Sequence, residues 1–431
     1  MSEWKQTEIG IIPFDWKIQS SSIYCKKITD GTHDSPKSAT SGYPLITSKH
    51  IKDSLIDFKE AYLVSEEDYQ AIIKRSKVEQ YDLIISMIGE YCGFTYLEMN
   101  QEVNYAIKNV GLFKNKSLTA AKWLKYYLDS PIGKHQLRLR RSGTSQPYIS
   151  LGALRELPII TPSSEDERKK IVDILSCLDN KIDNLRRQNE TLEKIAQTLF
   201  KHWFIDFEFP NDDGKPYKSS GGAMVASELG DIPAGWRVGK LEELIIVNPR
   251  ESIKTGAIVK YVDMRALSTS SMEITDYVTR EFTSGSKFKN QDTLLARITP
   301  CLENGKTAFV SILDDGEVAF GSTEFIVLRA KENCCPEYIY PLARSPYFRD
   351  FAVKNMTGSS GRQRIPNDVI ANYKLAIPDI QTIKNYQKIC RPLFLKTSSN
   401  QKQIQILTKT RDALLPKLMS GELRVKDSIT L

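Results

Sequence analysis

The chain repeats itself, and this duplication limits the folds it can adopt more than any other feature of its sequence. The segment 8–16, EIGIIPFDW, returns near the middle of the chain at 228–236 as ELGDIPAGW. The pair Ser130-Pro131 returns as Ser345-Pro346 in a similar setting. Segments that recur in the same order, about 215–220 residues apart, indicate two copies of one structural unit. The 431 residues are therefore expected to form two similar halves of about 215 residues each.

Each half ends in a long amphipathic pattern. In the first half, Ser164 and Glu167 form a capping box that predicts a helix start, and apolar steps of four and three continue to Phe200. The second pattern ends at Ser420-Gly421, a typical C-cap, and Pro392 is expected to kink or restart this helix near its beginning. The residues predicted to pair are Leu178, Ile182, Leu185, Asn189 and Leu192 in the first helix, and Leu393, Asn400, Ile404, Leu407 and Leu414 in the second.

Two long helices with half-apolar seams are expected to pack on each other. Asn189 falls at a seam position, where an asparagine facing a residue such as Asn400 would fix the register of the pair. Two alternatives stay open. Each helix could instead cover the domain next to it, and Asn189 could be a solvated residue at the end of the seam.

The segments before the two helices have mixed α/β patterns. Strands are predicted at 81–88, 109–113, 259–264, 293–298 and 324–329, and short helices at 122–128 and 337–342. Residues 214–222, rich in Gly and Ser, resemble a linker. The predicted fold class is α+β, with a first domain at 1–155, a helical region and linker at 156–215, a second domain at 216–378 and a C-terminal helical region at 379–431.

Several loops of the two domains combine cations with small hydroxyl residues. Lys and Arg supply charge for phosphates, Ser, Thr and Gly allow close backbone approach, and Arg, Asn, Gln and Tyr can reach base edges. Any one charged loop is usually solvated surface, but loops of this kind recur in both halves. The candidate DNA-binding residues of the first half are Lys27, Thr29, Asp30, Thr32, His33, Ser48, Lys49, His50, Arg138, Arg141, Thr144, Gln146 and Tyr148. Those of the second half are Arg250, Arg297, Thr299, Asn304, Lys306, Ser359, Ser360, Arg362, Gln363 and Arg364.

The sequence offers little evidence of catalysis or of a metal site. The net charge of +7 permits a polyanionic partner without requiring one. No C-x-x-C pair occurs, and the four histidines are not at ligand spacing, so no metal ligand is predicted. Neither a phosphate-binding loop nor an Asn-Pro-Pro-Tyr step is found, so no catalytic residue is predicted. Because apolar runs are short and the N-terminus lacks a secretory pattern, we expect a cytoplasmic protein without membrane spans.

Taken together, the motifs resemble a known family. They are DGTH at 30–33, RITP at 297–300, LENGK at 302–306, GSTEF at 321–325, RQR at 362–364 and LLPKLMSG at 414–421. With the duplication, they make essentially the whole chain similar to a specificity (S) subunit of a type I restriction-modification system.

The resemblance implies a function. In this family, two target recognition domains each read one half of a bipartite, asymmetric DNA target, and the two helices pack as an antiparallel coiled coil. The helices set the spacer between the half-sites and dock modification subunits. The S subunit itself is not catalytic and binds no cofactor directly. S-adenosylmethionine, ATP and Mg are expected on the modification and restriction subunits, which are the expected partners besides double-stranded DNA.

Two other functions are compatible with the residues. One is a standalone DNA-modifying enzyme, a nuclease or methyltransferase with an unrecognised catalytic site. The other is a coiled-coil scaffold that binds only proteins.

Overall fold

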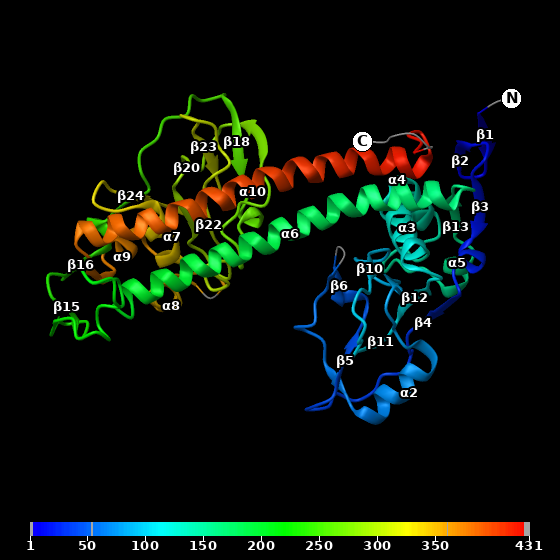
Figure 1. The fold of residues 1–431 in the computed structure, drawn as a ribbon, viewed down its shortest axis with the longest axis horizontal. Coiled ribbons are helices and arrows are strands. Elements are labelled where there is room, and N and C mark those ends of the chain that lie inside the picture. Colours follow the sequence, from blue (N-terminus) through cyan, green and yellow to red (C-terminus); the bar gives the residue numbers. More distant parts are fainter. Residues whose placement is uncertain (1–2, 53–54, 360, 426–431) are drawn as a thin grey trace. The chain divides into compact units, whose positions relative to one another are not determined.

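The structure, a computed structural model, describes residues 3–52, 55–359 and 361–425 (Figure 1). The chain divides into two compact units. The first comprises the residues up to Lys181 and those from Leu407 onward, and the second is Ile182–Ile406. Each unit therefore holds one α/β domain and a part of each of the two long helices, α6 (Glu165–Phe204) and α10 (Ile380–Ser420). The domain boundaries drawn from the sequence stay a prediction.

The first unit is built on a four-stranded antiparallel sheet in the order β10-β9-β12-β4. These strands are Thr95–Leu97, Leu83–Ser86, Val110–Lys114 and Lys27–Asp30. A second sheet joins β11 (Ala106–Ile107), β5 (Tyr43–Ile46) and β8 (Leu63–Val64). The paired strands outside these sheets are β1 (Trp4–Thr7) with β2 (Gly10–Pro13), β3 (Lys17–Ser20) with β13 (Pro158–Thr161), and β6 (Ile51–Lys52) with β7 (Leu55–Ile56).

Short helices flank these sheets. Their bounds are α1 (Ser21–Tyr24), η1 (Ser48–His50), α2 (Glu66–Ser76), α3 (Leu118–Asp129), α4 (Pro131–Leu139) and α5 (Leu151–Arg155). In the core, Trp16 from the repeated segment meets Trp123 of α3 edge to face, with ring centres 5.9 Å apart. The repeated tryptophan is thus a core residue.

The second unit repeats this plan. Its first sheet has the order β17-β24-β21-β22, made of Ile245–Val247, Phe325–Ala330, Thr293–Ala296 and Thr307–Phe309. A second sheet joins β19 (Val278–Glu281), β18 (Ile258–Val262), β23 (Ala319–Gly321) and β20 (Ser286–Phe288). The remaining elements are β14 (Met224–Val225), β15 (Ile232–Pro233), β16 (Arg237–Lys240), η2 (Leu241–Glu243), η3 (Met264–Ala266), α7 (Pro336–Arg344), α8 (Pro346–Lys354), α9 (Asn367–Ala371) and β25 (Lys374–Ile377).

A buried ion pair confirms the duplication at atomic detail. In the first unit, Asp82 accepts hydrogen bonds of 2.8 Å from the Lys114 ammonium and from the Glu79 backbone N–H. In the second, Asp292 accepts from the Arg329 guanidinium at 2.7 Å and from the Lys289 backbone N–H at 2.8 Å. The same carboxylate closes the turn before the same central strand in both units.

The two long helices pair within each unit, and they run antiparallel. In the second unit, the Asn400 amide donates to the Asn189 side-chain oxygen at 2.8 Å. In the first unit, Arg411 donates to the Asp179 carboxylate at 2.9 Å. Residues later in α10 contact residues earlier in α6, so the two helices are antiparallel. The expected contact between Asn189 and Asn400 is observed. All ten predicted pairing residues are buried or half-buried.

The helices also contribute to the domain cores, so the alternative that each covers a neighbouring domain describes a second role. Phe204 of α6 packs edge to face on Tyr338, with ring centres 4.7 Å apart. Leu418 and Met419 of α10 are buried in the core that holds Trp16. Each apolar face thus serves two contacts.

The prediction that Pro392 restarts the second helix is wrong. The helix begins at Ile380 and continues as one element to Ser420. Proline removes one hydrogen bond and crowds the carbonyl four residues earlier. Both Pro392 and Lys388 are exposed, so water can satisfy that carbonyl.

No helix of the described residues is long and apolar enough to cross a bilayer.

Candidate nucleic-acid interface

In the first unit, the loop after β9 and the loop after α4 are joined by backbone hydrogen bonds. Gly89 donates to the Pro147 carbonyl at 2.9 Å, and Ile149 donates to the Met87 carbonyl at 2.9 Å. Ser142 and Tyr148 exchange two backbone hydrogen bonds of 2.8 Å. The segment 142–148 is therefore a closed loop anchored to the end of the central sheet.

The second unit builds the same frame from different residues. Thr299 donates to the Gln363 carbonyl at 3.1 Å, and Ile365 donates to the Arg297 carbonyl at 3.0 Å. Thr357 and Arg364 exchange backbone hydrogen bonds of 2.9 and 2.8 Å. Every bond has its counterpart in the first unit, so Arg364 occupies the place of Tyr148.

Near the start of each closed loop, a glycine adopts a backbone conformation that L-residues rarely adopt. Gly143 has φ +84° and Gly358 has φ +122°. At Gly143, an added Cβ would lie 2.5 Å from the Gln146 carbonyl oxygen. This explains why the Ser-Gly and Thr-Gly steps recur in the sequence.

Polar side chains tie the other predicted loops of the first unit to this frame. The Ser48 hydroxyl donates to the Asn109 carbonyl at 3.0 Å and accepts from the backbone N–H of Met87 at 3.2 Å. The two ring nitrogens of His33 lie 3.0 Å from Asn109 Oδ1 and from Asp30 Oδ2. The loops that follow β4 and β5 therefore meet the strand end at Asn109.

Burial divides the predicted DNA-binding residues of the first unit into two groups. Thr29, Asp30, Thr32, Ser48 and His50 are buried. Asp30 pairs with Arg75 and His33, and His50 accepts a 2.9 Å hydrogen bond from the Thr47 backbone. The exposed residues are Lys27, His33, Lys49, Arg138, Arg141, Thr144, Gln146 and Tyr148.

Lys27 lies apart from the other exposed residues. It lies opposite Lys114 in the β4–β12 strand pairing. This is the start of β4, whereas Asp30 and the loop that follows it are at the end of that strand. Arg141 has a positioning contact as well, since its guanidinium donates to the Cys92 carbonyl.

In the second unit, the exposed predicted residues are Arg250, Asn304, Ser359, Arg362 and Arg364. Arg297, Thr299, Lys306 and Gln363 are half-buried. Arg297 donates to the Ile365 carbonyl at 2.9 Å, and Lys306 donates to the Met264 carbonyl at 2.9 Å. Ser360 lies outside the described residues.

Two residues that organise these edges, Asn109 and Glu324, are absent from the predicted DNA-binding residues. They occupy equivalent places before β12 and β24, as the pairing of Val110 with Ser86 and of Phe325 with Ala296 shows. Glu324 lies within the GSTEF motif at 321–325, which was a signal for it. Only the fold reveals that Asn109 is its counterpart.

At the loop edge of the second unit, the ion pair between Glu324 and Arg364 changes the pKa of the glutamate. The hydrogen bonds from Arg364 hold the pKa of the Glu324 carboxyl below its usual range, so this residue is ionised at neutral pH. In the first unit, burial lowers the pKa of the His50 imidazole, with the neighbouring Lys49 as a further cause. His50 is thus a neutral residue that shapes its loop.

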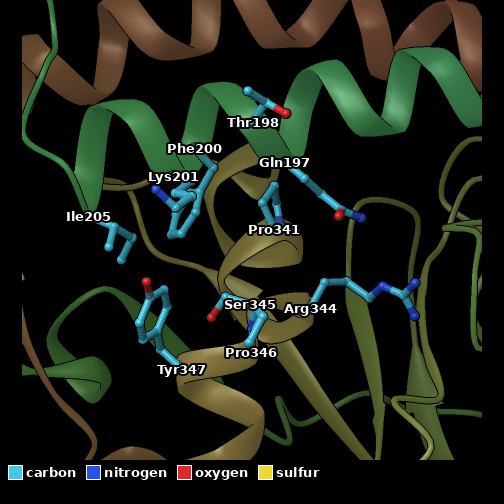
Figure 2. Close-up of a pocket in the computed structure, with 10 residues that line it drawn as sticks. All are labelled: Gln197, Thr198, Phe200, Lys201, Ile205, Pro341, Arg344, Ser345, Pro346 and Tyr347. Carbon is cyan, nitrogen blue, oxygen red and sulfur yellow. The ribbon is translucent and has the colours of Figure 1, made fainter.

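No metal-binding cluster is evident in the part of the chain that the structure describes. That part contains no group of three or more His, Cys, Asp or Glu side chains able to hold a metal ion. A cavity of about 220 Å³ lies where α6 faces the α7–α8 elbow (Figure 2). Its cations are engaged, since Lys201 pairs with Asp206 and Arg344 donates to the Gly305 carbonyl at 2.8 Å.

The fold thus defines a class of protein with two related loop edges, carried on copies of one α/β domain that share a pair of long helices. Comparisons with known proteins agree with this class. Residues 25–194 match the model of the type I restriction modification DNA specificity domain. The type I restriction enzyme MjaIX specificity subunit of Methanocaldococcus jannaschii is 29% identical, over 99% of this chain and 98% of its own length.

Two further relatives extend the agreement. The HindI specificity subunit of Haemophilus influenzae is 24% identical over 66% of this chain and 72% of its own length. The crystal structure of a type I restriction-modification S subunit from M. genitalium has the same fold, with a TM-score of 0.57 and 14% identity over 94% of this chain and 96% of its own. The chain is thus similar to type I restriction-modification specificity subunits over nearly its whole length, as the sequence motifs indicated.

Proposed function

We propose that the chain is the DNA sequence-specificity subunit of a type I restriction-modification complex. Each α/β domain reads one half of a bipartite, asymmetric target, and α6 with α10 sets the spacer and docks modification subunits. The chain recognises DNA and performs no chemistry itself. S-adenosylmethionine, ATP and Mg belong to the modification and restriction subunits.

One observation supports this proposal more than any other. The two units hold their loop edges in the same hydrogen-bonded frame, yet they place different side chains on it, such as Tyr148 in one and Arg364 in the other. A shared frame with exchanged side chains suits two readers of one polymer that recognise unlike sequences. The specificity subunits to which the chain is similar are consistent with this reading.

The experiment is a binding selection from random duplex DNA with the full-length chain in the presence of its modification subunits. We expect a split motif with two unlike halves separated by unread base pairs. A single continuous motif, or two identical halves, would contradict the proposal.

The same material separates the alternatives. Methyl transfer or DNA cleavage by the purified chain without other subunits would favour the standalone enzyme. Binding of protein subunits with no DNA selection at all would favour the scaffold.

A further inference from the structure

We propose that Arg364, held along one edge by Glu324, recognises a guanine in the half-site read by the second unit. The inference rests on the proposed function and deepens it, because it assigns one base to one residue.

The contacts between the two side chains fix how the guanidinium is presented. Arg364 Nε lies 3.0 and 2.9 Å from the two carboxylate oxygens of Glu324, and Nη2 lies 2.6 Å from Oε1. The carboxylate therefore occupies the edge of the guanidinium formed by Nε and Nη2. Such two-point pairing is the geometry in which arginine and carboxylate bind most strongly.

This pairing leaves the opposite fork of the arginine available. A guanidinium carries five N–H groups, and the carboxylate takes the Nε and Nη2 donors on one edge. Nη1 has only a 3.5 Å contact with the Arg362 carbonyl, which is at the limit for a hydrogen bond. One N–H on each of Nη1 and Nη2 can then point away from the protein, and this pair matches the O6 and N7 acceptors of guanine in the major groove.

The backbone on both sides holds this arrangement in place. Arg364 is paired with Thr357 in both directions, and its neighbour Ile365 is paired with Arg297. Glu324 is anchored too, because its carbonyl accepts a 3.0 Å hydrogen bond from the Arg297 N–H. The side chain of Arg364 is 45% exposed and that of Glu324 is 24% exposed, so the fork is accessible while its support is partly covered. Arginine held in this way loses less side-chain freedom when it binds a base.

In the first unit, the equivalent hydrogen-bonded loop carries no arginine–glutamate pair at these two positions. Tyr148 stands at the place of Arg364, and Asn109 stands at that of Glu324, where it contacts His33. A tyrosine hydroxyl cannot supply the two parallel donors that select guanine. The inference is therefore specific to the second half-site, and the first half-site is an internal control within the same molecule.

The test compares the full-length wild type with Arg364→Lys and Glu324→Gln in the binding selection with modification subunits present. For Arg364→Lys, we expect the preference for guanine at one position of the second half-site to fall about tenfold or more, because lysine lacks the paired donors. Glu324→Gln should weaken the same preference by a smaller factor. The preferences of the first half-site should not change in either variant.

Arg362→Ala is the matched control, since it removes an exposed arginine from the same closed loop. It should lower affinity and flatten the dependence of binding on salt while leaving the guanine preference intact. The inference is overturned if Arg364→Lys lowers affinity uniformly with no change of base preference, or if the affected position is not a G·C pair. A wild type that selects no motif would instead overturn the proposed function itself.

Discussion

Buried polar side chains support the loop edge of the first unit from within. Ser48 and His50 have the right chemistry for DNA contact, yet they are 8% and 1% exposed and bond within their own domain. Polar residues near a functional loop often hold the loop in place, and local sequence does not separate these two uses. The second unit also holds a carboxylate network that no sequence pattern predicted, centred on the buried Glu193 and the half-buried Glu273.

This network joins a loop of the second domain to both long helices. Glu193 accepts 2.6 Å hydrogen bonds from the Tyr340 hydroxyl and the Met272 N–H, with Arg344 Nε at 3.8 Å. Glu273 accepts from the Asn189 amide. Burial raises the pKa of both carboxyls, and the charge of Glu193 raises that of Glu273 further. Glu190 acts in the same direction on Glu273, while Arg186 opposes it.

Glu273→Gln should make the protein's stability less dependent on pH. A raised pKa in the folded state means that the unfolded chain loses this proton first as pH rises, so the wild type loses stability above the ordinary glutamate range. Glutamine stays neutral. The unfolding temperature of the variant, relative to that of the wild type, should therefore be higher at pH 8 than at pH 5. Thermal unfolding at the two values measures this difference. Glu332→Gln, at an exposed position, should show no such trend, and an equal trend in both variants would refute the assignment.

Elements were predicted well where one local pattern decides them. The predicted strands at 81–88 and 109–113 contain β9 and most of β12, and the capping box at Ser164 marks the start of α6. The pairing of β12 with β4 was beyond local reasoning, because it joins segments about 80 residues apart. The continuity of α10 through Pro392 was not predicted, because proline suggests a break and only the exposure of its helix face shows why none occurs.

Asn400→Leu tests the polar contact between the long helices. The variant removes the donor to Asn189 Oδ1, leaving a buried acceptor without its partner from α10. We expect a loss of about 1–3 kcal/mol in the free energy of unfolding, measured by denaturant titration. Asn385→Leu, at an exposed site on the same helix, should change it by less than about 0.5 kcal/mol. A stabilised Asn400→Leu would show that the seam prefers an apolar residue and that the asparagine pair has no structural value there.

At the scale of the whole molecule, the duplication was the most informative signal. It correctly anticipated two α/β domains of one plan, because equivalent sequence segments produced equivalent bonds, such as those of Asp82 and Asp292. The half-sites could not be predicted. They depend on which side chains a shared frame carries, and the frame itself emerges only when distant loops are brought together.

We propose that the length of the helix pair sets the number of unread base pairs between the two half-sites. Inserting one heptad into α6 after Lys181 and one into α10 after Ile406 keeps the seam in register. Seven residues add about 10 Å of helix, which corresponds to roughly three base pairs of B-DNA. Binding selection with this full-length variant should return both half-sites unchanged, with a spacer longer by about three base pairs. An unchanged spacer, or a changed half-site, would contradict the account.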